Sequence, residues 1–195
     1  MKLANAIIAA LILSTTVPGC APVVVGGAAA TGGTMAYSRR SAGAVLDDEI
    51  IEVKARLAIL EDEDLNSQIH INIISYNGIV LMVGQAPTEA LRARAESIVS
   101  GVEKVRMVHN EMTIAAPSSF MTRSSDTVIT GKVKTNILGL MEGDDNDGLR
   151  TKVVTENGVV YLMGLLSRSE ADAVTEAARQ VGGVQKVVKL FEYTG

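Results

Sequence analysis

The sequence predicts an α+β fold built from two tandem copies of one module, each with the element order α-β-β-α-β, a three-stranded sheet and two helices on one face. The first observation is an internal repeat, because residues 75–84 (SYNGIVLMVG) return as residues 155–164 (TENGVVYLMG). The second is the spacing of the copies, about 80 residues, which is too long for a solenoid unit and suits a duplicated small domain. The third is an Asn-Gly pair in each copy, which predicts a tight hairpin between two strands and excludes the βαβαβ order of a dinucleotide-binding fold.

The composition limits the function classes. The chain has 195 residues, of which 47% are hydrophobic and only 3% aromatic, so small aliphatic side chains must fill the cores. A formal net charge of −4 argues against a nucleic-acid-binding protein held by phosphate contacts. Beyond the N-terminus no segment has the roughly 18 apolar residues that a bilayer-spanning helix needs. At about 70 residues each, the modules are near the lower limit for an independent core, so we expect them to pack on one another.

The N-terminus has the pattern of a secretory signal peptide, assigned to residues 1–19. Lys2 supplies the positive charge, residues 3–13 are almost entirely apolar, and small residues lead to Cys20, the only cysteine. A lone cysteine directly after such a segment resembles the lipobox of bacterial lipoproteins, which implies that Cys20 is acylated and becomes the mature N-terminus. Ala21 follows it, which under the sorting rule of enteric bacteria favours the outer membrane. The alternative is an incidental cysteine in a cleaved peptide.

Residues 20–45 are Ala/Gly-rich and are predicted to form a tether behind the lipidated cysteine. The first module is assigned to residues 46–114, and Asp47 and Asp48 are expected to cap its first helix. That helix should bury one stripe, formed by Ile51, Ala55 and Ile59. The other predicted elements are a loop at 61–68, a half-buried strand at 69–73, a hairpin turn at Asn77-Gly78, a return strand at 79–83, a helix from Thr88 to near Gly101 and a strand at 105–114.

A linker at 115–124 leads to the second module, assigned to residues 125–195. Asp126 is expected to cap its first helix, and Ser167 with Glu170 predicts a capping box for the second. The inward faces of the two helices should be formed by Ile129, Val133 and Ile137 and by Val174, Ala178 and Val181. The strands are predicted from about Leu149 to the turn at Asn157-Gly158, at 159–163 and at 184–193.

Four motifs stand out in the modules: a helix beginning Asp-x-x-Ile, a hairpin of the form x-Asn-Gly-x-Val-x-Leu-x-Gly, a Glu-Ala-containing helix and a Gly-Val-x-x-Val strand. Together they resemble the BON domain. Two such domains behind a lipoprotein signal resemble the family of dual BON-domain outer-membrane lipoproteins of Gram-negative bacteria, which are associated with division and outer-membrane stress. The resemblance covers essentially the whole chain. It implies a non-catalytic, lipid-anchored protein on the periplasmic face that binds anionic phospholipids, supports envelope integrity and gathers at division sites.

The resemblance also implies where the lipid is bound. In the family the first helix of the second BON domain contacts anionic phospholipids, which transfers here to the helix from Asp126 to about Leu140. With the apolar stripe turned inward, the outward residues implied to contact phospholipid are Thr127, Val128, Gly131, Lys132 and Thr135. Lys132 and Lys134, with Arg123, could meet anionic headgroups, while the plainer interpretation is a solvated helix face.

Other chemistry finds little support in the sequence. The acidic run at 142–148 is not a calcium-binding EF-hand loop, because aligning Gly148 with the sixth position puts Gly143 at the first and Val154 at the twelfth, where carboxylates are needed. His70 and His109 have no partner at metal-ligand spacing and activate no serine. We therefore predict no enzyme, no cofactor and no nucleic-acid partner.

Two functions stay open at this stage. The leading hypothesis is a phospholipid-binding module. The alternative is a protein-interaction adaptor for envelope-assembly machinery or cell-wall-linked partners. The first helix of the first module carries acidic Glu49 and Glu52 where the second has Thr127 and Thr130, so the second copy should carry the lipid contact.

Overall fold

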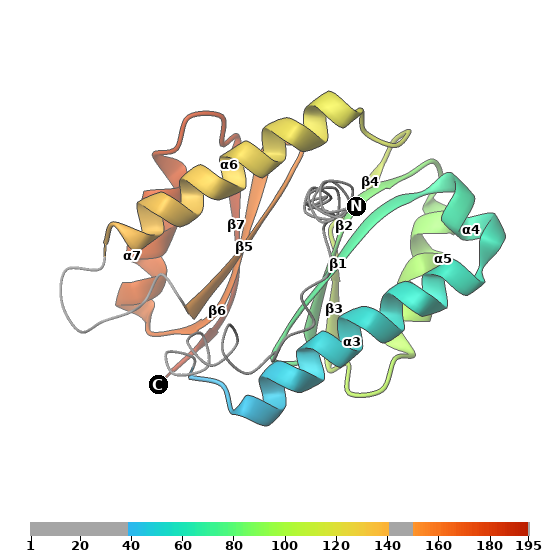
Figure 1. Cartoon of the computed structure of the whole chain (residues 1–195), viewed down its shortest axis with the longest axis horizontal. Coiled ribbons are helices and arrows are strands. Elements are labelled where there is room, and N and C mark those ends of the chain that lie inside the picture. Colours follow the sequence, from blue (N-terminus) through green and yellow to red (C-terminus); the bar gives the residue numbers. More distant parts are fainter. Residues whose placement is uncertain (1–38, 141–149, 195) are drawn as a thin grey trace, which may run out of the picture. The chain divides into compact units, whose positions relative to one another are not determined.

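The computed structural model describes residues 39–140 and 150–194, and confirms the predicted α+β class (Figure 1). The predicted signal peptide, Cys20 and the acidic run at 142–148 lie outside these residues. The first module consists of α3 (Ala42–Glu61), α4 (Glu63–Gln68), β1 (His70–Tyr76), β2 (Ile79–Ala86), α5 (Glu89–Ser100), β3 (Met107–Asn110) and the short β4 (Thr113–Ile114). The second consists of α6 (Phe120–Leu138), β5 (Thr151–Glu156), β6 (Val159–Leu166), α7 (Arg168–Arg179) and β7 (Lys186–Tyr193).

Each module is built around a mixed sheet whose hairpin return strand lies in the centre. β2 pairs antiparallel with β1 and parallel with β3, and β6 pairs in the same way with β5 and β7. Two long helices cover one face of each sheet, α3 and α5 in the first module and α6 and α7 in the second (Figure 1). The predicted inward stripes of the first helices are buried in these helix–sheet cores: Ile51, Ala55 and Ile59, and Ile129, Val133 and Ile137.

Both predicted hairpin turns are present. Asn77 and Gly78 have φ of 53° and 74°, and Asn157 and Gly158 have φ of 49° and 74°, the positive values that a two-residue type I′ turn needs. Farther along β2, Gly84 has φ of 129°, and a Cβ there would lie 2.0 Å from the carbonyl oxygen of His70. That position therefore requires glycine.

The predicted start of the first helix was wrong in both modules. α3 begins at Ala42 and α6 at Phe120, with Ser41 and Ser119 as N-caps whose hydroxyls accept from the backbone amides three residues on. Asp48 and Asp126 lie inside the helices, buried, and their carboxylates accept hydrogen bonds from both backbone amides of the hairpin turn. Asp48 bonds the amides of Asn77 (2.7 Å) and Gly78 (2.8 Å). Asp126 bonds the corresponding two amides of the second turn at 2.9 Å each. Each aspartate thus ties the first helix of its module to the hairpin.

Two smaller predictions also need correction, and one is confirmed. The predicted loop at 61–68 contains a helix, α4, capped by the Asp62 side chain. The predicted strand at 105–114 is divided into β3 and β4, both paired with β2, because Glu111 and Met112 interrupt it. The Asn110 side chain accepts from the Met112 amide at the interruption. The capping box of Ser167 and Glu170 is present at the start of α7.

Residues 69–73 are half-buried, as expected, since Asn72 is exposed and Ile73 is buried. Beyond them the hairpin strands are buried on both faces, as in β2 and β6. The faces turned away from the helices meet in an inter-sheet cluster of Ile74, Tyr76, Leu81, Val83, Val154, Tyr161 and Met163. Polar contacts join the same modules: the Tyr76 hydroxyl donates to the Arg150 carbonyl (3.0 Å), and the Lys152 ammonium donates to Glu52 (2.6 Å). Burial raises the pKa of Tyr161 to about 12. The expectation that the two copies pack on one another is confirmed.

Candidate functional site

The outward face of α6 presents the residues that the sequence indicated. Ile129, Val133 and Ile137 point into the core, while Val128 is 56% exposed beside them. The inward and outward positions predicted for Ile129 and Val128 are therefore confirmed. Binding of a lipid by these residues stays a prediction.

Four of the five predicted lipid-contact residues line one open groove between α6 and the end of α7. This α6–α7 groove has a volume of about 550 Å³ and is lined by Val128, Gly131, Lys132, Thr135, Asn136, Gln180, Val181 and Gly182. A Cβ at Gly131 would meet nothing within 4 Å, so the glycine leaves the floor of the groove open. The groove thus combines an exposed apolar side chain, one lysine and accessible backbone.

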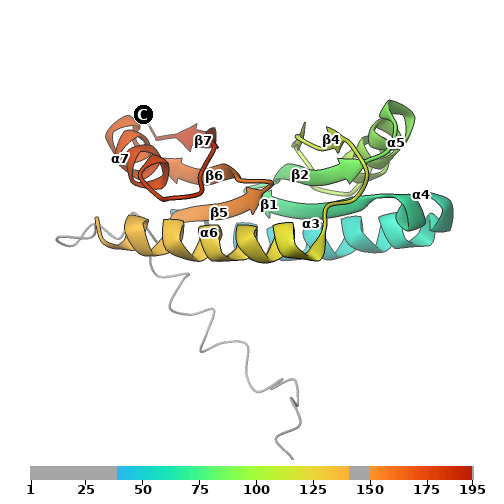
Figure 2. The same ribbon diagram turned by 90° about the horizontal axis from the view of Figure 1, so that it is seen from above.

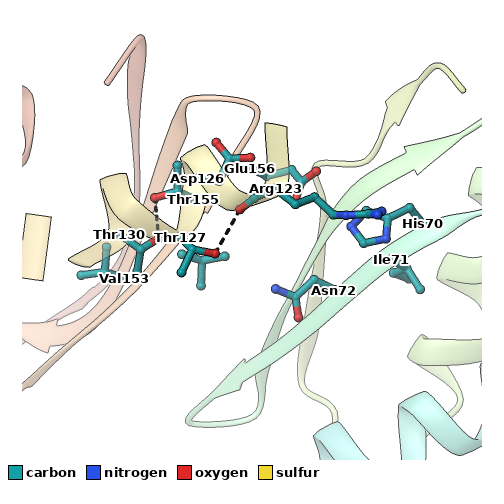
Figure 3. A pocket seen from close by; sticks show the side chains of 11 residues that line it. His70, Ile71, Asn72, Arg123, Asp126, Thr127, Thr130, Val153, Thr155 and Glu156 are labelled. Atoms are coloured by element: carbon teal, nitrogen blue, oxygen red, sulfur yellow. Dashed lines mark hydrogen bonds between the residues drawn. The ribbon is translucent and has the colours of Figure 1, made fainter. Parts of the chain in front are cut away.

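The fifth residue, Thr127, lies in a different hollow. A cleft of about 420 Å³ lies between α6 and β5 on one side and the start of β1 on the other, and Figure 3 shows the Arg123 side chain extending toward His70 across it. Thr127 and the buried Asp126 contribute to its wall. The structure therefore separates Thr127 from the other predicted contacts and places it beside Arg123.

Three threonine hydroxyls of α6 already have partners. Thr127 donates to the Arg123 carbonyl and Thr135 to the Gly131 carbonyl, each at 3.0 Å (the first is drawn in Figure 3), and Thr130 donates to the Thr155 hydroxyl at 2.8 Å. A threonine hydroxyl has one hydrogen, so these groups have none to offer to a phosphate. Within the α6–α7 groove, Lys132 is the cationic donor.

The prediction from the sequence missed exposed apolar residues at both ends of α6. Phe120 and Met121, in the first turn of α6, are each 78% exposed, and Leu138 and Leu140 are exposed at the other end. The first two were overlooked because Asp126 was taken as the helix start. The signal that could have revealed them is Ser119, an N-cap residue directly before two large apolar side chains. The apolar part of the α6 face is longer than predicted.

Both histidines of the chain lie in strands of the first module. His70 lies at the start of β1 and lines the cleft, and His109 lies in β3. Among residues 39–140 and 150–194, no group of three or more His, Cys, Asp or Glu side chains is arranged to hold a metal ion. In the same ranges, no helix combines the length and the hydropathy of a bilayer span.

Comparison with known proteins identifies the module. Residues 47–116 and 125–195 each match the BON domain. The chain is 35% identical over 188 residues to the outer membrane lipoprotein DolP of Haemophilus influenzae, with 94% of both chains covered. It is 38% identical over 154 residues to a 21 kDa hemolysin of Actinobacillus pleuropneumoniae (79% of this chain, 78% of the relative) and 27% identical over 153 residues to the osmotically-inducible protein Y of Escherichia coli (77% and 74%).

Proposed function

Since this chain belongs to the BON-domain family and carries two copies of the domain, we propose that it is a non-catalytic lipoprotein, anchored through Cys20 on the periplasmic face of the outer membrane, that binds anionic phospholipids through α6. Its relative in Haemophilus influenzae, similar over 94% of the chain, is an outer membrane lipoprotein, which supports the location. In this role the protein supports envelope integrity, in part at division sites.

The observation that carries the proposal is the α6–α7 groove. Val128, Gly131, Lys132 and Thr135 come together around one open hollow on the outward face of α6. An exposed valine offers apolar area to acyl chains, while a basic residue near an anionic surface contributes about 1 kcal/mol. Lys134 lies exposed on the same helix and adds to the positive charge.

The first module is less suited to an anionic surface at the matching positions. α3 has Glu49 and Glu52 where α6 has Thr127 and Thr130. Glu49 is exposed, and a carboxylate near anionic headgroups is repelled. We therefore assign the lipid contact to the second module.

The protein lacking residues 1–20 is expected to float with vesicles that contain anionic phospholipid and to stay in the soluble fraction with vesicles of neutral lipid alone. The physical reason is that Lys132 and Lys134 add attraction only at a negative surface. Raising the salt concentration should weaken the association, because the exposed charges are screened. Equal flotation with both kinds of vesicle would count against recognition of anionic lipid, and flotation with neither would count against phospholipid binding and favour the adaptor function.

Replacing Cys20 with alanine is expected to move the protein out of the outer-membrane fraction. Without the thiol no acyl chain can be attached, and the anchoring that several chains provide is lost. Fractionation of cells followed by immunoblotting measures the change, and a Ser14→Ala variant with the cysteine intact is the control. A Cys20→Ala protein that fractionates like the parent would rule out lipid attachment at this residue.

A further inference from the structure

α3 carries a continuous apolar stripe on its outward side. Five large side chains, Leu46, Ile50, Val53, Leu57 and Leu60, are each about half exposed, between 48% and 56%. Their spacing of four, three, four and three residues is the heptad pattern of a helix that packs against another helix. Figure 2 shows α3 along the lower edge of its module, with β1 and β2 above it. An apolar patch of a few hundred Å² on a single chain usually marks an interaction surface.

The α3 stripe is particular to the first module. The equivalent positions on α6 are Ser124, Val128, Gly131, Thr135 and Leu138, two of which are large apolar residues. The module therefore folds without an apolar stripe at these positions. A separate role must account for it on α3.

We propose that the α3 stripe is a self-association surface, on which α3 of a second copy packs antiparallel about a two-fold axis at the middle of the helix. α3 runs from Ala42 to Glu61, so its midpoint falls between Ile51 and Glu52. In that alignment Ile50 lies against Val53 of the second copy, Leu46 against Leu57, and Leu60 against Gly43. Gly43 is exposed and leaves room for a large side chain, since a Cβ there would meet only the Ser41 hydroxyl, at 3.8 Å.

The charges that flank the stripe are self-complementary in the same alignment. Asp47 lies opposite Lys54 of the second copy, and Glu49 lies opposite Arg56. Each helix thus contributes two acidic and two basic side chains to the interface. In the single chain Asp47 pairs with Lys104, Lys54 with Glu103 and Arg56 with Glu52. The side chains of Asp47, Lys54 and Arg56 are exposed, and ion pairs of exposed side chains are weak, so these side chains can turn to the second copy.

The acidic C-terminal end of α3 selects the antiparallel direction. Glu61, Asp62, Glu63 and Asp64 follow one another there. A parallel pair would bring two such ends together, whereas an antiparallel pair places each beside the positive N-terminal end of the other helix. The same carboxylates, with exposed Glu49, disfavour an anionic membrane as the occupant.

Disulfide cross-linking in the full-length, membrane-bound protein tests this arrangement. Leu46→Cys and Leu57→Cys lie about 16 Å apart along one helix, too far for a bond within one chain. The chain carrying both substitutions should form a covalent dimer on mild oxidation, because residue 46 of one copy meets residue 57 of the other. Each single variant should form none above the baseline of the parent chain, whose only cysteine is Cys20. Dimers from either single variant, or none from the double variant, would overturn the proposal.

A second change checks that the cross-link reports the apolar contact. Adding Val53→Glu to the double-cysteine chain should lower the dimer yield at least about tenfold, because each of the two copies would bury one carboxylate in the interface. The matched control is Met107→Glu on β3, where the side chain is similarly exposed (53% against 54% for Val53) and lies outside α3. Circular dichroism of both variants checks that they stay folded, which is the expected result. If Val53→Glu leaves the yield unchanged, or if it abolishes vesicle association while no dimer forms in any chain, self-association through α3 is wrong.

Discussion

Replacing Asp48 with alanine is expected to lower the free energy of unfolding by about 3–5 kcal/mol, the cost of removing one partner from a buried charged network. Asp48 is 3% exposed and pairs with Arg40. Its carboxylate also accepts from the Ser75 hydroxyl at 2.6 Å and from both amides of the first hairpin turn. Alanine leaves those buried donors and the guanidinium without their acceptor, so the turn and the helix lose their connection.

Denaturant unfolding followed by circular dichroism measures this loss. Asp126→Ala should cost less, about 2–3 kcal/mol, because its carboxylate accepts from two backbone amides, whereas that of Asp48 also pairs with Arg40. Asp172→Ala is the control, since Asp172 is exposed on α7 and such a change typically stays within about 0.5 kcal/mol. If Asp48→Ala and Asp172→Ala unfold at the same denaturant concentration, the buried carboxylate does not hold the hairpin.

Val128→Glu is expected to abolish association with anionic vesicles while the protein stays folded. The side chain is 56% exposed and lines the α6–α7 groove, so a carboxylate there remains in water until it meets the membrane. At the membrane it would have to lose its hydration beside lipids of the same charge. Flotation and a thermal melt of the same sample give the two readouts.

The neighbouring position is the matched contrast. Ile129 is 7% exposed and packs in the core of the second module, so Ile129→Glu buries an unpaired charge and should cost more than about 4 kcal/mol. That variant should fail to float because the module is unfolded, with a melting curve to match. Val128→Glu that floats as well as the parent would show that α6 is not the lipid face, and the adaptor function would then take precedence.

The elements set by local chemistry could be predicted from the sequence. Asn-Gly pairs at both turns need no distant partner to adopt positive φ, and Ser167 with Glu170 forms its capping box within four residues. The inward stripes of the helices followed from spacing alone. Where local chemistry decides the outcome, the sequence is sufficient.

The errors arose where a distant contact decides. Asp48 and Asp126 look like helix caps, and only the fold shows that each accepts hydrogen bonds from a turn about 30 residues later. The second apolar face of the strands had a signal in the sequence, because Ile74, Leu81 and Val83 lie on the face opposite to Ile73 and Met82. What a single copy of the repeat cannot reveal is that this face is covered by the other copy.

The inter-sheet cluster has the reciprocity of contacts between identical subunits. In the alignment of the repeats, Tyr76 corresponds to Glu156 and Gln85 to Leu165. The Tyr76 hydroxyl accepts from the Leu165 amide, and the Gln85 amide donates to Glu156, so position 76 of each copy meets position 85 of the other. The apolar members of the cluster also occupy equivalent positions in the two repeats: Ile74 and Val154, Leu81 and Tyr161, and Val83 and Met163. This is the geometry of an isologous interface.

The two modules thus associate as the subunits of a two-fold symmetric dimer do, but one peptide connection, residues 115–119, joins them covalently. Joining the halves turns their association into an intramolecular step, which no longer depends on the concentration of the protein. Because the two modules are separate parts of one chain, their sequences can differ, and the outer faces of α3 and α6 need not be the same. They differ at equivalent places, Val53 on α3 and Gly131 on α6, so one covalent pair can present two unlike surfaces to its surroundings.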